Sequence, residues 1–278
     1  MTIASDEYME VDGTPLQTYA MNIETVGGAR RAPTKFRGDN VKIPHRRGGR
    51  FRKKVPDQRT LSLNMWVRGC DDDGKIPSGR TARALYEQNL DRLINLLWRG
   101  EDDQMVLTKR VFKGEAITPV DALAEFSGGL EPSMIGRRAA KMTVDLLLAD
   151  PYFYDRTWTT VTLANGNNSI VVPGTAKTTK IKVTINGARN VTRLRNSTYG
   201  VETTYNDSLN AGDVALLDID AFNAYKTPSG QTQVRMNTKV VHQGDAEWLY
   251  LKPGTNVIAL SSTSGAGQVQ LQYKAAWQ

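Results

Sequence analysis

Asp218 and Asp220 are the two carboxylates whose spacing suits acid–base chemistry. Residues two apart on a β-strand point to the same face, and a carboxylate pair on one face can supply the acid and the base of a glycoside hydrolase. The alternative is a solvated strand face, with Leu217 before the pair and Ile219 between the two carboxylates turned inward. We favour the second interpretation, because no other catalytic pattern accompanies the pair.

Other reactive residues are few. Cys70 is the one cysteine and has no histidine near it in the sequence, so we expect an inert thiol and no disulfide. Asp71-Asp72-Asp73-Gly74 resembles a calcium loop but lacks its alternating spacing and closing glutamate. His45 and His242 are too few for a histidine-rich metal site. With no nucleophile elbow, zinc-protease helix or phosphate-binding glycine loop, we predict no enzyme, no cofactor and no metal.

Aromatic residues leave one alternative open. Trp158, Trp248 and Tyr250 could together form a sugar-stacking platform. Aromatic side chains at alternate strand positions more often belong to a hydrophobic core. A carbohydrate-binding module therefore remains the second candidate function.

The strongest charge feature is a basic segment near the N-terminus. Residues 30–59 hold twelve basic residues against Asp39 and Asp57, a local charge of +10 within a chain of net charge +7. Such a cluster suits either phosphate backbones or an acidic protein partner. No recognition helix or RNA-binding signature accompanies it, and Gly48-Gly49 indicates a hairpin tip.

Composition indicates an ordinary packed chain. The 278 residues are 40% hydrophobic and 23% charged, which excludes global disorder. No apolar run approaches the roughly 20 residues of a membrane helix, and the N-terminus does not resemble a signal peptide. We expect synthesis in a cytosol-like compartment and no membrane insertion.

Hydrophobic periodicity predicts strands around one helix in the first half. Leu61, Leu63, Met65 and Val67 alternate along a half-buried strand, Arg59–Arg68. Thr81–Trp98 has the apolar spacing of a helix that packs on a sheet, with Thr81 as N-cap and Gly100 as stop. Further strands are expected at 17–26, 33–43 (around a turn at 38–40), 104–113, 115–120 and Arg138–Leu148, and a loop at 69–80.

A domain junction is predicted at Asp150-Pro151-Tyr152-Phe153-Tyr154, because proline cannot donate to a sheet ladder. It separates domains 1–150 and 151–278. Beyond it, short alternating runs recur between turn signals such as Asn186-Gly187 and Pro253-Gly254, which is typical of an antiparallel β-sandwich or barrel. The expected strands are Trp158–Leu163, Ser169–Val172, Lys180–Ile185, Val191–Asn196, Val201–Tyr205, Val214–Ile219, Asn223–Tyr225, Gln231–Met236, Trp248–Leu251, Val257–Leu260 and Gln268–Tyr273.

These features together resemble the distal tail proteins of long, non-contractile-tailed bacteriophages, the siphovirus tail-component family. The resemblance rests on four segments and covers nearly the whole chain. They are the basic hairpin His45–Lys54 leading into Arg59–Arg68, the helix Thr81–Trp98, the junction Leu148–Asp155, and the C-terminal β region with its segment Trp248–Ile258.

The resemblance implies a mainly β architecture in two parts. The N-terminal domain is expected to be a tail-tube-like β-sandwich or split barrel with one amphipathic helix, which forms a ring. The C-terminal domain is expected to be a galectin-like or jelly-roll β-sandwich. No inserted carbohydrate-binding module is apparent in it.

The implied function is structural. Six copies would form a ring at the distal end of the tail, in the virion, after synthesis in the host cytoplasm. Expected partners are other copies of the chain, the tail tube protein, the tail-associated hub or tip protein and receptor-binding proteins, with DNA only passing through the channel. The alternative is an adsorption module that contacts host-surface glycans.

Clusters of opposite charge are the candidate interface residues of this ring. The basic members are Arg46, Arg47, Arg50, Arg52, Lys53 and Lys54, and the acidic members are Asp71, Asp72 and Asp73, with Glu101–Asp103 as a second acidic run. Ring closure by repeated heterologous contacts needs complementary patches on each subunit.

Overall fold

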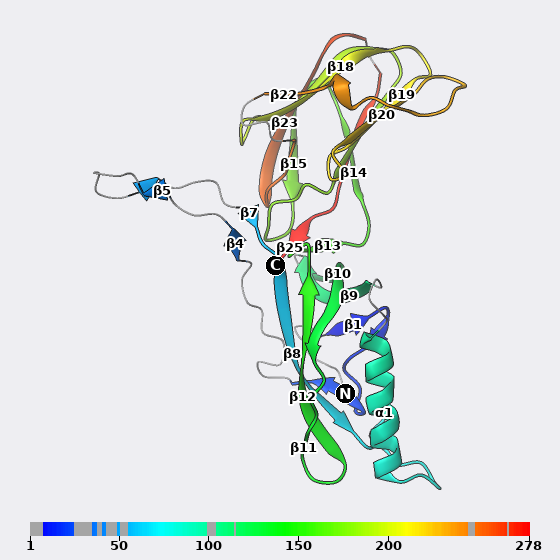
Figure 1. Cartoon of the computed structure of the whole chain (residues 1–278). Helices are drawn as coiled ribbons and strands as arrows, with labels where there is room; N and C mark the ends of the chain where they lie inside the picture. Colours follow the sequence, from blue (N-terminus) through cyan, green and yellow to red (C-terminus); the bar gives the residue numbers. More distant parts are fainter. Residues whose placement is uncertain are drawn as a thin grey trace. The chain divides into compact units, whose positions relative to one another are not determined.

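The computed structural model describes residues 8–24, 35–37, 41–42, 49–50, 55–98, 104–113, 115–243, 248–265 and 267–278. The chain divides into two compact units, which we call unit 1 (Met1–Phe153 with Gln278) and unit 2 (Tyr154–Trp277). The sequence-based boundary lies at Pro151. Both units are built mainly of antiparallel strands, as the predicted mainly β class requires (Figure 1).

Unit 1 contains most of the strands of one curled sheet and the helix. Its strands follow the order β2-β1-β9-β10-β12-β8-β3, with β11 paired to β12. The bounds are β1 Met9–Val11, β2 Thr14–Pro15, β3 Met21–Ile23, β4 Phe36–Arg37, β5 Val41–Lys42, β6 Gly49–Arg50, β7 Val55–Pro56, β8 Arg59–Arg68, α1 Ala82–Leu97, β9 Met105–Lys113, β10 Ala116–Gly129, β11 Ser133–Met134 and β12 Ala139–Leu148.

The β8–β12 pair forms the core of unit 1. Leu61, Leu63, Met65 and Val67 are all buried, as their alternation predicts. Each faces an apolar partner across the ladder, for example Leu63 opposite Val144. Full burial of one such side chain contributes about 1.5–3 kcal/mol, so this pair of strands alone stabilises the unit substantially.

Strand β10 curls the sheet by changing partners along its length. Residues 116–124 pair with β9 and residues 125–129 pair with β12, with a bulge between Phe126 and Gly128. A strand that passes from one sheet to another through a bulge makes the corner of a sandwich or barrel. Gly129 lies at this corner with φ 94°, where a Cβ atom would lie 2.0 Å from the Thr143 carbonyl oxygen.

Helix α1 begins and ends close to the predicted positions. The Thr81 hydroxyl accepts a hydrogen bond from the Ala84 amide at 3.2 Å, which confirms the N-cap. Leu85, Tyr86, Leu93 and Leu97 are buried. The prediction that Trp98 belongs to the apolar stripe is wrong: Trp98 is 66% exposed, because its backbone leaves the helix (φ −97°, ψ 95°) and its ring no longer follows the helical spacing.

Other N-terminal predictions need correction. Among the described residues of the strand expected at 17–26, which end at residue 24, only Met21–Ile23 form a strand. The short strands Met9–Val11 and Thr14–Pro15 were missed, because two or three residues are too few to show a period. The turn at 38–40 and the helix stop at Gly100 lie outside the described residues. Gly49 lies in β6 opposite Lys42 of β5, so Gly49 is a strand residue and not part of the predicted hairpin tip, whose other residue, Gly48, lies outside the described residues.

Unit 2 is a two-layer antiparallel sandwich, which confirms the predicted β-sandwich. One sheet has the order β14-β24-β16-β19-β20-β21 and the other β15-β23-β17-β18-β22 (Figure 1). The bounds are β13 Phe153–Asp155 (shared between the units), β14 Thr159–Leu163, β15 Gly166–Val172, β16 Ile181–Asn186, β17 Arg189–Asn196, β18 Val201–Leu209, β19 Val214–Asp218, β20 Asn223–Thr227, β21 Val234–Arg235, the 3₁₀ helix η2 Asn237–Lys239, β22 Val240–Gln243, β23 Gly254–Gly265, β24 Val269–Tyr273 and β25 Ala276–Trp277.

Inward-facing residues of both sheets form the core of unit 2. Val183 and Leu217 come from one sheet and Leu194, Tyr205 and Ile258 from the other, and all are fully buried. One predicted strand is wrong. Residues 248–251 make only an isolated bridge, between Leu251 and Thr178. The strand Val240–Gln243, which pairs with β18, was not predicted.

Candidate interaction surfaces

Asp218 and Asp220 lie on the solvated side of their segment, as the favoured interpretation predicts. Leu217 and Ile219 are fully buried. A carboxylate oxygen of Asp220 lies 2.6 Å from the Lys180 ammonium, and one of Asp218 lies 3.5 Å from Lys182. Each carboxylate therefore pairs with its own lysine. The two carboxylates do not face a common point at which a substrate could react with both.

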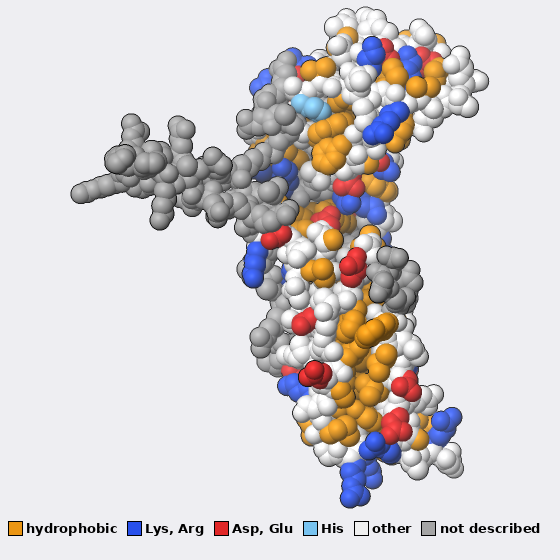
Figure 2. Space-filling model, in the orientation of Figure 1, with side chains coloured by type: hydrophobic (Ala, Val, Ile, Leu, Met, Phe, Trp, Pro, Cys, Tyr) orange, Lys and Arg blue, Asp and Glu red, His pale blue; other side chains and the backbone are white. Residues whose placement is uncertain are grey.

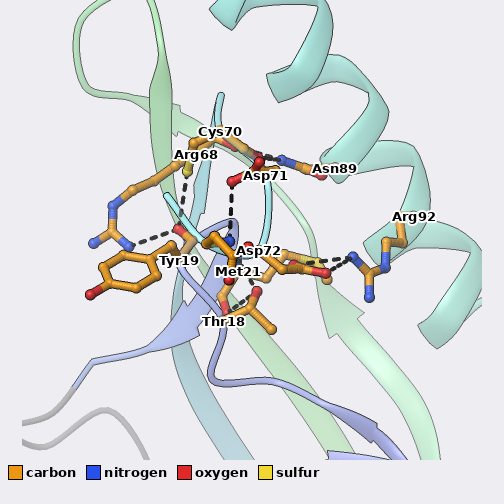
Figure 3. A network of polar contacts seen from close by, with 10 residues as sticks. Thr18, Tyr19, Met21, Arg68, Cys70, Asp71, Asp72, Asn89 and Arg92 are labelled. Atoms are coloured by element: carbon orange, nitrogen blue, oxygen red, sulfur yellow. Dashed lines mark hydrogen bonds and ion pairs between the residues drawn. The ribbon is translucent and has the colours of Figure 1, made fainter. Parts of the chain in front are cut away.

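The acidic run Asp71–Asp73 forms part of a polar network beside α1 (Figure 3). One Asp71 carboxylate oxygen accepts hydrogen bonds from the amides of Asp73 (3.1 Å) and Lys75 (2.7 Å), which closes the loop on itself. The Asp72 carboxylate lies 2.9 Å from the Arg92 guanidinium. Two of the three predicted interface carboxylates thus have partners within unit 1, and Asp73 lies exposed beside them.

Asp72 illustrates how opposing effects set a pKa. Burial would raise the pKa of its carboxyl, but hydrogen bonds from Arg92 and Thr18 outweigh burial and lower it. The main-chain oxygen of Asp72 also accepts from the Tyr19 amide at 3.3 Å. Asp72 is therefore ionised, and it connects two elements: its carboxylate contacts Arg92 of α1, and its main-chain oxygen contacts Tyr19 in the segment after β2.

Cys70 and Asn89 belong to the same network. The Asn89 side chain is buried and donates to the carbonyl oxygens of Arg68 (2.7 Å) and Cys70 (2.8 Å). Burial raises the pKa of the Cys70 thiol, and the thiol lies 3.5 Å from the Tyr19 carbonyl oxygen. A protonated, hydrogen-bonded thiol suits a structural role.

Most of the predicted basic interface lies outside the described residues. This is the case for Arg46, Arg47, Arg52, Lys53, Lys54 and His45, and also for the acidic run Glu101–Asp103. The backbone of Arg50 lies in β6, opposite Val41 of β5. The interface roles of these residues stay predictions.

The junction residues are mostly buried. Pro151, Tyr152 and Phe153 have little exposed surface, and the Asp150 carboxylate accepts from the Tyr152 amide at 3.4 Å. Burial raises the pKa of Tyr152. Within unit 2, the ring of Tyr154 lies 5.3 Å from the Lys180 ammonium.

The three aromatic residues of the predicted platform have different neighbours. Trp158 lies beside lysine ammonium groups, and Tyr250 is nearly buried beside the ring of Tyr199. Trp248 contacts the rings of Phe222 and His242 instead. The sequence analysis missed Phe222 and His242, which come from segments 20 residues apart and show no shared pattern.

Unit 1 carries exposed apolar residues that the sequence analysis also missed. Phe112 (54% exposed) and Ile117 (47% exposed) are cross-strand partners in β9 and β10. Leu123 is exposed farther along β10. Figure 2 shows hydrophobic side chains gathered on the surface of this unit. Clusters of exposed apolar residues commonly mark interaction surfaces.

Nothing in the described ranges indicates a bound metal or a membrane span. No group of three or more His, Cys, Asp and Glu side chains among these residues could hold a metal ion. No described helix is long and apolar enough to cross a bilayer.

Comparison with solved structures shows the fold of the whole chain. The Dit protein (gp 19.1) of phage SPP1, described as a paradigm of the hub adsorption apparatus in phages infecting Gram-positive bacteria, matches with a TM-score of 0.64 and 12% identity over 98% of this chain and 99% of that chain. Chains of the phage P2 baseplate in its activated conformation, with Ca and with Sr, match at 9% identity with TM-scores of 0.41 and 0.42 and cover 96% of this chain and 97% and 96% of theirs.

No family model matches the chain, and no curated protein is significantly similar to it in sequence. The match to SPP1 Dit nevertheless spans both units rather than one of them. The resemblance to phage distal tail proteins is therefore confirmed at the level of the fold. The chain has, from end to end, the fold of SPP1 Dit.

Proposed function

We propose that this protein is a structural subunit of the distal end of a long, non-contractile phage tail, where it forms a ring that joins the tail tube to the tip and the host-adsorption apparatus. The observation that carries the proposal is the end-to-end match of the two-unit fold to SPP1 Dit. A fold can serve several functions, so the surfaces of this chain must support the role as well.

The surfaces of unit 1 suit contacts with other proteins. Phe112, Ile117 and Leu123 expose large apolar side chains on neighbouring strands. Isolated apolar residues are common on protein surfaces, but Phe112 and Ile117 lie directly opposite each other on neighbouring strands, and such neighbouring exposed residues suit a contact with another protein. In the proposed ring, unit 1 contacts further copies of the chain and the tail tube protein.

The chemistry of the described sites also fits a structural role. Asp218 and Asp220 each contact a lysine, and the Cys70 thiol is hydrogen-bonded with a raised pKa. We propose that the protein is not an enzyme and that its partners are the tube protein, the hub or tip protein and receptor-binding proteins. It is made in the host cytoplasm, and DNA only passes through its channel.

The direct test of the ring is the mass and shape of the purified full-length chain. Native mass spectrometry should detect a species of six times the 30.8 kDa subunit mass, and negative-stain class averages should show six-fold rings with a central opening. If only monomers form, the chain should be mixed with purified tail tubes. Monomers that also fail to bind tube ends would contradict the proposal.

A further inference from the structure

Three ring-bearing side chains meet on the surface of unit 2: Phe222, His242 and Trp248. The ring centroid of Trp248 lies 5.7 Å from that of Phe222, nearly edge to face, and 4.5 Å from that of His242. Phe222 is 59% exposed, and the other two are half-buried. Figure 2 shows a histidine beside hydrophobic side chains on the visible surface. We call these three residues the aromatic cluster.

Phe222 lies in a turn of unusual backbone conformation. Its φ of 53° lies in the left-handed region, which is unfavourable for a bulky side chain. Asn237 stabilises this turn from both sides: its side chain accepts from the Ala224 amide at 2.6 Å and donates to the Phe222 carbonyl oxygen at 3.2 Å. Backbone strain that surrounding contacts maintain is characteristic of ligand sites.

Hydrogen-bonding groups lie next to the rings. The Asn223 side-chain oxygen accepts from Asn237 at 3.1 Å and also from Arg235. The His242 ring nitrogen Nδ1 lies 3.5 Å from the Thr203 hydroxyl. Burial lowers the pKa of His242 against an opposing main-chain hydrogen bond at Glu202, so the imidazole is neutral at pH 7. Amides, a guanidinium and a neutral imidazole supply both donors and acceptors.

We propose that the aromatic cluster is a stacking site for a neutral glycan. A pyranose ring presents C–H groups on its face and hydroxyl groups around its edge. The C–H face complements the negative face of an aromatic ring, and the hydroxyl groups complement the amide and guanidinium groups beside the cluster. A protein partner fits less well, because a stable protein interface buries about 800 Å² on each side, more than three rings present.

The test is affinity electrophoresis of the full-length chain in native gels that contain a soluble neutral polysaccharide. At pH 7 the chain has a formal net charge of +7 and migrates toward the cathode. The probes are an α-glucan, a β-glucan, a mannan and a galactan. At least one should retard the native chain. Phe222→Asn and Trp248→Ala should weaken that retardation about tenfold, and Phe222→Tyr should retain it.

Two controls keep the result interpretable. Val171→Ala removes another exposed apolar side chain of unit 2, 70% exposed on β15, and should leave retardation unchanged. Asparagine tolerates the left-handed backbone region, so Phe222→Asn should unfold at the native temperature or above. No retardation by any of these polysaccharides, or Asn and Ala variants retarded as strongly as the native chain, would overturn the glycan site. Neither result depends on ring formation, so the two proposals fail separately.

Discussion

The Asn89 side-chain amide lies 2.7 Å from the carbonyl oxygen of Arg68, the last residue of β8. The same nitrogen donates to the carbonyl of Cys70 at 2.8 Å. Asn89 thereby joins the buried face of α1 to the end of the central strand, and it satisfies two main-chain oxygens that would otherwise lack these donors. These two hydrogen bonds explain why a polar residue, Asn89, lies on the buried face of the helix.

Replacing Asn89 with alanine should destabilise the protein by about 2–3 kcal/mol, because the substitution removes both hydrogen bonds and leaves carbonyl oxygens unsatisfied. Urea unfolding followed by circular dichroism measures this loss. Asn95→Ala is the matched control, since Asn95 is exposed on the same helix. Equal midpoints for the two variants would show that the Asn89 contacts contribute nothing.

Gly69 should not tolerate a side chain. A Cβ atom there would lie 1.9 Å from the Ala82 carbonyl oxygen at the start of α1, so Gly69→Ala should force the helix away and cost about 1–3 kcal/mol. Gly79→Ala is the control. Gly79 has φ 77° but open space around it, so this substitution introduces backbone strain without a steric clash. The melting temperature of Gly69→Ala should be lower than that of Gly79→Ala. The reverse order would refute the close approach of Gly69 to the Ala82 carbonyl oxygen.

Asp213 should make stability depend on acid pH. Hydrogen bonds from the amides of Asn210 and Ser229 lower its pKa below the usual 3.8, and Lys226 adds to the effect. A lowered folded-state pKa means that the stability from Asp213 is present above pH 3.8 and is lost as the pH falls through the folded value. Asp213→Asn should therefore reduce the urea midpoint at pH 7 and reduce it much less at pH 3. The exposed Asp91→Asn variant serves as control, and a pH-independent difference for Asp213→Asn would argue against the effect.

The exposed pair Phe112 and Ile117 should contribute to assembly rather than to folding. Phe112→Glu with Ile117→Glu should cost only about 1–2 kcal/mol and leave the chain folded, since both side chains are about half exposed and the two glutamates would repel each other across the strands. The same double variant should lose the rings seen by negative-stain microscopy. Val171→Glu, on unit 2, should still form rings. Rings in the double variant would exclude this surface from the subunit contact.

The basic segment should be required for ring formation or tube joining. Reversing Arg46, Arg47, Arg50 and Arg52 to glutamate changes the local charge by eight units and would repel the acidic partner surface that the sequence analysis expects at this interface. Co-sedimentation with tail tubes and class averages of the variant provide the readout. If the variant formed normal rings that still joined tubes, electrostatic pairing by the basic segment would not be needed for assembly.

Long periodic elements were predictable from the sequence. Arg59–Arg68 matches β8 residue for residue, and Thr81 is the N-cap of α1, because alternation and capping residues are local signals. Short elements such as Met9–Val11 were missed, since three residues do not define a period. Trp98 was misplaced because helical spacing continues in the sequence after the backbone has left the helix.

The surfaces were less predictable, for physical reasons. The aromatic cluster combines Phe222, in a strained turn, with His242 and Trp248 from later segments, so only the tertiary fold brings the rings together. The exposed pair Phe112 and Ile117 lies in strands whose alternation indicates two faces without telling which face meets solvent. Asp71 and Asp72 looked like free surface charges, but loop closure and Arg92 engage them.

Immunogold electron microscopy of purified virus particles encoding this chain tests the central claim most directly. Antibodies raised against the full-length chain should place gold at the distal end of the tail, between the tube and the tip. Particles that contain no detectable chain, or gold distributed over the capsid or along the tube, would contradict the account.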